Sequence, residues 1–152
     1  YSGTTEAAIK QGATDLASDN FIGYGTWKWA DLQSQTGGKP VYRYFYTHPR
    51  PVLKGETAKS TGASHSAEIE YAMGNLSTNR FFDWQAEDYA VSEIIQGFFV
   101  NFIKTGNPNG LGLPEWPSVK PNLPAEVMNI GIESHSATEL HLDRYLFLDK
   151  SH

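Results

Sequence analysis

The pattern of hydrophobic and polar positions predicts one strong helix in the second half of the chain. Between residues 87 and 104, apolar side chains recur every three or four positions and form one continuous face. Glu87 and Asp88 open the segment and Lys104 closes it, which complements the helix dipole. Gly106 suits the left-handed residue that ends many helices. We therefore predict an amphipathic helix here.

The N-terminal part of the chain predicts two further helices. Residues 5–17 carry a narrow apolar stripe, and residues 21–35 space aromatic and aliphatic side chains at helical intervals. We predict that Ser18-Asp19-Asn20 ends the first helix and caps the second. The second helix should end at Thr36-Gly37-Gly38-Lys39-Pro40, because proline cannot continue a helix.

Residues 41–47 predict the strongest strand, since aromatic and β-branched side chains dominate them and glycine or proline flanks both ends. A nearly continuous apolar run suits a strand covered on both faces by helices. A proline-marked loop, 48–61, follows, and a short helix should begin at Glu68. Helix, turn, strand and then loop is a layout typical of α/β folds. The expected fold class is therefore α/β.

The C-terminal third is less regular. Residues 111–124 hold four prolines and should run over the surface, and residues 127–132 predict a strand. Residues 143–150 fit either a strand or a short terminal helix, and the pattern does not decide between them.

Composition excludes several classes of function. The chain has 152 residues, 39% of them hydrophobic, which suffices for the core of one domain. The net charge of −5 without a basic cluster argues against a nucleic-acid partner, and no apolar run is long enough to span a bilayer. The absence of cysteine removes disulfides and the common zinc clusters. Because the first residue is Tyr1 and no signal-like segment follows, we expect a processed or truncated chain.

His65 is the best candidate for chemistry. It lies among small residues in a loop that follows the strongest strand, where α/β enzymes keep catalytic groups. A neutral imidazole can accept and return a proton. His48 precedes a proline at a strand end, and His152 is the last residue. His135 and His141 lie near glutamates, but their spacing matches no metal site, so we expect neither a metal nor a cofactor.

Two supporting residues flank this histidine. Glu68 lies three positions after it, too close to reach Nδ1 while Nε2 stays free. We expect Glu68 and Ser66 to support the site from behind, with an exposed acid at a helix start as the alternative for Glu68. A serine hydrolase would also need Gly-x-Ser-x-Gly, but residues 62–66 have serine in place of the second glycine. The chain therefore offers no nucleophile of its own.

Three segments together resemble a known family. They are residues 41–45, residues 62–69, and residues 101–109 followed by Trp116-Pro117. Their order and spacing resemble the C-terminal quarter of the type B carboxylesterases, the α/β-hydrolase family of cholinesterases and bacterial para-nitrobenzyl esterases. The chain is most similar to the bacterial members. The resemblance covers nearly the whole sequence.

The resemblance implies a role for each matching residue. His65 would be the triad histidine, acting as general base toward a serine and as general acid toward the leaving alcohol. Glu68 would belong to a buried polar network behind the site, and Asp19 would be structural. In α/β-hydrolases the triad runs serine, acid, histidine along the chain. Residues 1–152 would then be the C-terminal segment of one α/β-hydrolase domain, with the other catalytic parts upstream.

The expected function is serine-dependent hydrolysis of a small carboxylic ester through an acyl-enzyme. The expected partner is the N-terminal fragment of the same polypeptide, without which this chain should be inactive. Four aromatic residues are our guesses for the substrate pocket: Tyr71, Phe81, Phe82 and Trp84. The alternatives are a non-catalytic, cholinesterase-like interaction protein and a carbohydrate- or ligand-binding module. Since bacterial relatives are often exported, we expect the periplasm or secretion, with the cytoplasm as the alternative.

Overall fold

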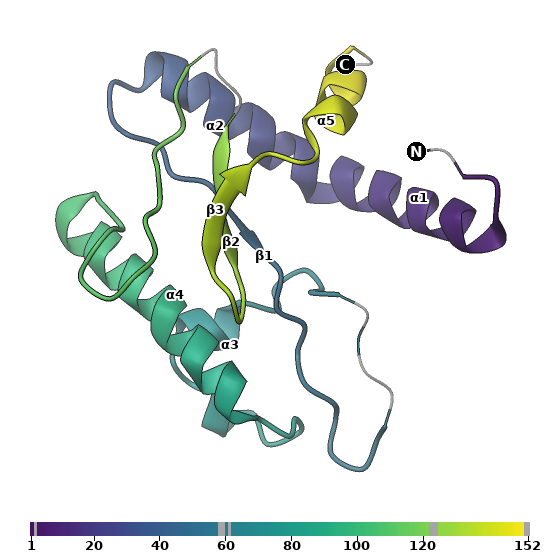
Figure 1. Cartoon of the computed structure of the whole chain (residues 1–152), viewed down its shortest axis with the longest axis vertical. Coiled ribbons are helices and arrows are strands. Elements are labelled where there is room, and N and C mark those ends of the chain that lie inside the picture. The colour runs from purple at the N-terminus through teal and green to yellow at the C-terminus, as the bar shows by residue number, and fades with distance from the viewer. Residues whose placement is uncertain (2, 58–59, 61, 122–124, 151–152) are drawn as a thin grey trace. The chain divides into compact units, whose positions relative to one another are not determined.

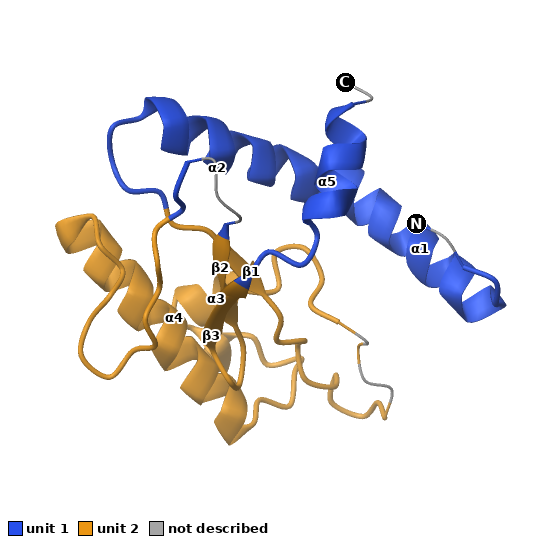
Figure 2. Ribbon diagram, turned by 45° about the horizontal axis from the view of Figure 1, so that its top comes forward, with its two compact units in different colours: residues 1–41, 119–125, 138–152 blue, residues 42–118, 126–137 orange. Residues whose placement is uncertain are grey.

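The described residues of the chain form two compact units (Figure 2). The computed structural model describes residues 1, 3–57, 60, 62–121 and 125–150, so His152 and parts of the predicted segments 48–61 and 111–124 lie outside it. Unit 1 contains residues 1–41, 119–125 and 138–152. Unit 2 contains residues 42–118 and 126–137.

Unit 1 is built from helices (Figure 1). Helix α1 spans Glu6–Ser18, a π-helical turn η1 spans Asp19–Gly23, and α2 spans Tyr24–Thr36. The predicted stop at residues 18–20 is therefore wrong, because Ser18 and Asp19 both keep right-handed helical dihedrals. Asp19 caps no helix, since its carboxylate accepts a hydrogen bond from the Tyr1 hydroxyl at 2.8 Å and pairs with Arg144 at 2.8 Å.

Helix α5, Leu142–Asp149, settles the open choice at the C-terminal end in favour of a helix. Arg144 of α5 also pairs with Asp15 of α1 at 2.9 Å. Trp27 of α2 stacks on Tyr145 with ring centroids 5.7 Å apart. Ion pairs and ring packing therefore hold α5 against the other helices of this unit.

Unit 2 contains a small mixed sheet with strand order β1-β2-β3. Its strands are β1 Tyr44–Tyr46, β2 Glu126–Ile130 and β3 His135–Thr138, the last residue of which belongs to unit 1. Strands β1 and β2 are parallel, with Tyr44 opposite Met128. A four-residue turn joins β2 to β3 and, being so short, makes that pair antiparallel. Strand β3 was not predicted, and β1 is shorter than its predicted range of 41–47.

Helix α4, Ala86–Thr105, confirms the strongest predicted helix to within one residue at each end. The side chain of Asp88 caps its start, and Gly106 ends it with φ 76°. Helix α3, Ile69–Ala72, lies along α4, and α4 packs against β2 (Figure 1). A 3₁₀ turn, η2 Leu76–Thr78, follows α3. The buried core of this unit comprises Tyr71, Leu76, Val91, Ile95, Phe98, Trp116, Met128 and Ile130.

A buried carboxylate joins three segments of this core. Asp88 is only 2% exposed. Its Oδ1 accepts a hydrogen bond from the Tyr71 hydroxyl at 2.6 Å and lies 2.7 Å from His48 Nε2, while its Oδ2 accepts the Gln85 N–H at 2.7 Å. Burial, reinforced by the bond to Asp88, raises the pKa of Tyr71, so this phenol stays a donor. The end of β1, helix α3 and the start of α4 therefore meet at one charge.

Among the described residues, no helix combines the length and apolar composition needed to cross a bilayer.

Replacement of this carboxylate by an amide tests its role. Asp88→Asn should lower the free energy of unfolding by about 2–3 kcal/mol, because the amide of asparagine cannot accept from all three of these donors at once. The measurement is urea denaturation of the protein. Glu87→Gln, at the exposed neighbouring position, is the control and should cost less than about 1 kcal/mol. Equal midpoints for the two variants would contradict this account of Asp88.

Candidate active site

The proposed catalytic histidine stands on an exposed turn just before α3. His65 is solvent-exposed, whereas Ala67, two residues later, is fully buried. The Ala67 N–H donates to the Ser64 carbonyl at 3.0 Å and closes the turn. The buried alanine anchors the turn to the protein, and the imidazole is exposed to solvent.

The turn depends on an uncommon backbone conformation at Ser66. Its φ of 65° is the only positive φ of a non-glycine residue in the part of the chain that the structure describes. The left-handed region costs an L-residue about 1–2 kcal/mol. The Ser66 carbonyl accepts hydrogen bonds from Arg50 Nη2 at 3.1 Å and from the Ile69 N–H at 3.4 Å. These contacts hold the backbone directly after the histidine.

A charged cluster lies beside this turn. Arg50 donates to Glu70 Oε2 from Nε at 2.9 Å and from Nη2 at 2.6 Å. The other oxygen of Glu70 accepts a hydrogen bond from Asn79 Nδ2 at 2.5 Å. The guanidinium also lies over the Phe82 ring, 5.5 Å from its centroid. No sequence pattern indicates this cluster, because Arg50 and Glu70 are twenty positions apart in the chain.

Glu68 is half-buried and acts on the tyrosines of β1. Burial raises the pKa of Tyr44, and the negative charge of Glu68 raises it further. Burial likewise raises the pKa of Tyr46, with smaller contributions from the charges of Asp88 and Glu68. The carboxylate of Glu68 is therefore electrostatically coupled to these phenols. Its supporting role behind the histidine, like that of Ser66, stays a prediction.

The four aromatic residues proposed for a substrate pocket occupy different environments. Tyr71 is fully buried in the core, whereas Phe81 is 77% exposed. Phe82 and Trp84 are half-buried with ring centroids 5.2 Å apart, and Trp84 also packs edge-on against Tyr71 at 5.6 Å. The role of all four residues in binding substrate stays a prediction.

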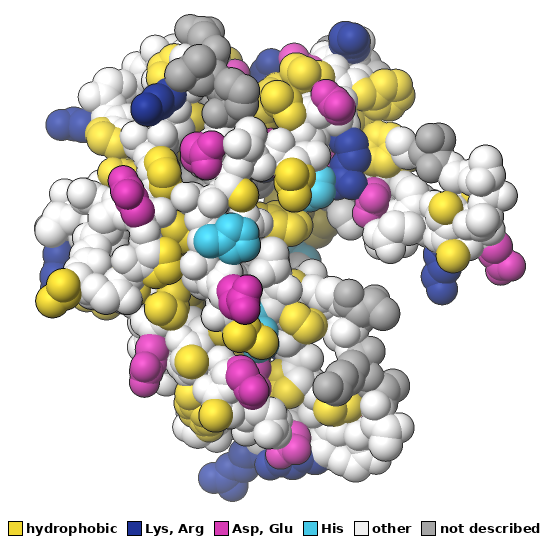
Figure 3. Space-filling view, viewed as in Figure 1, with side chains coloured by type: hydrophobic (Ala, Val, Ile, Leu, Met, Phe, Trp, Pro, Cys, Tyr) yellow, Lys and Arg dark blue, Asp and Glu magenta, His cyan; other side chains and the backbone are white. Residues whose placement is uncertain are grey.

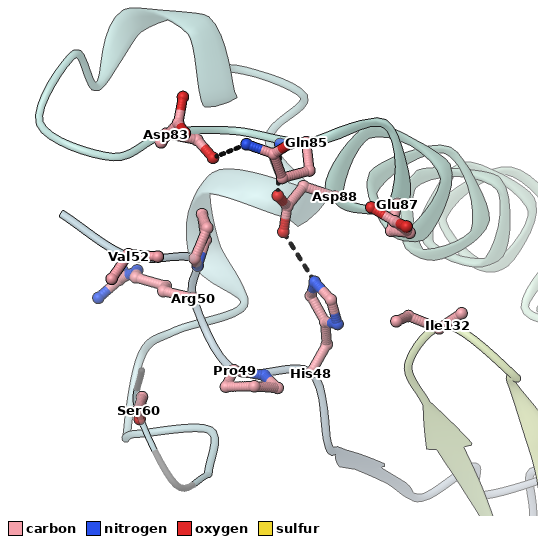
Figure 4. Close-up of a pocket in the computed structure, with 11 residues that line it drawn as sticks. His48, Pro49, Arg50, Val52, Ser60, Asp83, Gln85, Glu87, Asp88 and Ile132 are labelled. Carbon is pink, nitrogen blue, oxygen red and sulfur yellow. Dashed lines mark hydrogen bonds and ion pairs between the residues drawn. The ribbon is translucent and has the colours of Figure 1, made fainter. Parts of the chain in front are cut away.

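A cavity of about 480 Å³ lies next to the buried carboxylate (Figure 4). His48 reaches it from the end of β1, but its Nε2 points at Asp88, as the dashed line shows. Arg50, Glu87 and Ile132 line other parts of the wall, and His65 does not line it. The sequence pattern indicates for His48 only a place at the end of a strand, because its partner Asp88 lies forty positions away. Among the described residues, no group of three or more His, Cys, Asp or Glu side chains could hold a metal ion.

Comparison with known proteins decides the family. Residues 1–147 match the sequence profile of the Carboxylesterase family. This chain belongs to that family. The resemblance inferred from the three sequence segments is therefore confirmed.

Individual relatives agree with this assignment. Carboxylesterase 5A of Canis lupus familiaris is 38% identical over 85 residues, which cover 53% of this chain and 15% of the relative. Carboxylesterase 4A of Bos taurus is 32% identical over 111 residues, covering 72% of this chain and 19% of the relative. The chain thus spans less than a fifth of the length of these curated carboxylesterases.

Solved structures define the fold. The carboxylesterase EST55 of Geobacillus stearothermophilus superposes with a TM-score of 0.74 at 23% identity, covering 96% of this chain and 29% of that one. An esterase of Clostridium hathewayi gives a TM-score of 0.66 at 21% identity, covering 83% of this chain and 24% of that one. The carboxylesterase chain therefore has part of the α/β-hydrolase fold, as predicted.

The conformation of Ser66 generates a stability prediction. Ser66→Gly should raise the free energy of unfolding by about 1 kcal/mol, because glycine adopts a positive φ without a steric penalty. The check is the midpoint of thermal unfolding. Ser64→Gly is the matched control at a position without positive φ, and it should be neutral or destabilising. A lower midpoint for Ser66→Gly would show that the turn does not strain this serine.

Proposed function

We propose that this chain is the C-terminal segment of a serine carboxylesterase and supplies the triad histidine, His65. The observation that carries the proposal is the exposed imidazole on a turn anchored by the buried Ala67. Membership of the Carboxylesterase family supports it, as do relatives named carboxylesterase. The whole of residues 1–152 would belong to one α/β-hydrolase domain.

The proposed reaction has two halves. A serine from the preceding part of the polypeptide attacks the ester carbonyl carbon, and His65 takes the serine proton. The imidazolium then gives that proton to the leaving alcohol, and an acyl-enzyme remains. Water attacks the acyl group with His65 again as base, which releases the carboxylic acid and restores the serine. The substrate class is a small, fairly apolar carboxylic ester, and the reaction needs no cofactor.

The proposed partner is the N-terminal portion of the same polypeptide, which would contribute the nucleophile, the oxyanion donors and the acid. Apolar side chains that such a partner could cover are exposed on unit 2, including Phe45 at 46% and Ile103 at 80%. Several apolar groups lie open on the face in Figure 3. Residues of this kind are rarely left exposed in contiguous patches on a complete soluble domain. Export to the periplasm or the medium stays part of the proposal.

Removal of the imidazole is the direct test. His65→Ala in the full-length polypeptide should lower kcat for a p-nitrophenyl ester by roughly a thousandfold or more, because no other group can accept the serine proton. His135→Ala is the control, since His135 is also exposed but its Nδ1 lies 2.7 Å from the Glu133 carbonyl. It should leave turnover unchanged. Near-normal hydrolysis by His65→Ala would exclude this role for His65.

Because the proposed activity needs the N-terminal portion of the polypeptide, active material should have a larger mass than this chain alone. Active esterase preparations should contain polypeptide beyond these 152 residues, either covalently joined or released only on denaturation. Native and denaturing mass spectrometry of the same material distinguishes the two forms. Hydrolysis of p-nitrophenyl esters by the 152-residue chain alone would contradict the proposal, because this chain carries no Gly-x-Ser-x-Gly elbow.

A further inference from the structure

We propose that Arg50 is a positioning residue that holds the His65 turn in its catalytic conformation. The inference rests on the proposed role of His65 and assigns a function to a side chain outside the triad. In this role Arg50 takes no part in the proton transfer. It acts through the backbone and through Glu70.

The guanidinium binds both the turn and the helix that follows it. Nη2 donates to the carbonyl of Ser66, the residue directly after His65, at 3.1 Å. Nε and Nη2 donate to the carboxylate of Glu70, in α3, at 2.9 and 2.6 Å. A planar fork of donors can serve a carbonyl and a carboxylate together, whereas a lysine ammonium is a single point of charge. The side chain of Arg50 therefore links the backbone at Ser66, directly after the histidine, to Glu70 of α3.

The ion pair between Arg50 and Glu70 is partly buried, so it can hold the two side chains in a fixed orientation. The side chains of Arg50 and Glu70 are 26% and 18% exposed. Asn79 holds the second oxygen of Glu70, and the Phe82 ring covers the guanidinium. Fully exposed ion pairs contribute little, but a partly buried pair with further hydrogen bonds is better ordered. The carboxylate cannot rotate away without losing both partners.

The backbone that carries Arg50 is also fixed. Two residues earlier, His48 is held by the buried Asp88. On the other side, residues around Leu53 and Phe82 form an antiparallel bridge, with the Lys54 N–H donating to the Phe81 carbonyl at 2.9 Å. The second bond of the bridge joins the Asp83 N–H to the Val52 carbonyl at 3.1 Å. The loop that carries Arg50 is therefore held by contacts on both sides of this residue.

The turn needs such a constraint because Ser66 has a positive φ. Without the bond from Arg50, the Ser66 peptide would be free to relax toward the right-handed region, and the histidine would move with it. A displacement of about 1 Å at a catalytic group can lower a rate by roughly a hundredfold. Substrate binding, which does not require the proton transfer, would change little. The expected signature is therefore a loss of kcat at nearly constant KM.

Arg144 offers a matched control within the chain. Its side chain is 25% exposed and pairs with two carboxylates, Asp15 and Asp19, within unit 1. Replacement of either arginine removes a partly buried cation that contacts two polar partner residues. Only Arg50 contacts the backbone next to His65. A general loss of stability would therefore affect the two variants alike, whereas a positioning effect would separate them.

The test uses the full-length polypeptide, with kcat expressed per active site titrated by the initial burst of p-nitrophenol. Arg50→Gln should lower kcat by about 10- to 100-fold with KM within about twofold of wild type. Arg50→Lys should recover part of the loss, because it restores the charge but not the fork. Arg144→Gln should lower the thermal midpoint and leave kcat per site unchanged.

The outcomes separate this inference from the proposed function. If His65→Ala is inactive but Arg50→Gln keeps wild-type kcat per site, Arg50 does not position the histidine and the esterase proposal stands. Equal losses of kcat in Arg50→Gln and Arg144→Gln would also overturn the inference. If Arg50→Gln fails to fold, Glu70→Gln weakens the same pair, and wild-type kcat in that variant would overturn it. Retained turnover in His65→Ala would overturn both proposals.

Discussion

The carboxylate of Asp88 is the constraint on which unit 2 depends. A buried charge is costly unless donors surround it, and here the donors come from different parts of the chain: Tyr71, His48 and the backbone of Gln85. The carboxylate is fully hydrogen-bonded only when all three donors are in place. The start of α4, helix α3 and the chain leaving β1 are consequently fixed together. Because Arg50 lies two residues beyond His48, the same charge also sets where the arginine can reach.

His48 and His65, both in unit 2, have opposite environments. His48 is 9% exposed and its Nε2 faces a carboxylate, so its ring has a structural partner. His65 is exposed on a turn whose neighbours are small, and the carbonyl of the next residue, Ser66, accepts a hydrogen bond from Arg50. A buried histidine next to aspartate resembles a catalytic pair in isolation. In His48, however, Nε2 is already paired with the buried Asp88.

Sequence patterns predicted the elements that depend on local periodicity. Helix α4 follows from its apolar face and from Gly106, and β1 follows from its aromatic run. The π-helical turn could not be predicted, because distant Tyr1 and Arg144 bind the Asp19 side chain that a local pattern assigns to a cap. Strand β3 has a polar sequence and exists through its pairing with β2. The loop position of His65 was predictable, but the Arg50 contacts were not, since pairs formed across a loop leave no spacing signal.

Glu68 and Glu70, the two glutamates that follow His65, are the nearest carboxylates to it in the sequence. Glu70 gives one oxygen to Arg50 and the other to Asn79, so both acceptors are occupied. Glu68 is half-buried and contributes to the raised pKa of the Tyr44 phenol of β1. An orienting acid for a triad histidine must instead face the ring nitrogen opposite the nucleophile. Because both oxygens of Glu70 bind other groups, Glu70 does not fill this place. In the proposed serine carboxylesterase, the orienting acid and the serine would both precede this histidine along the chain, which is the order serine, acid, histidine of α/β-hydrolases.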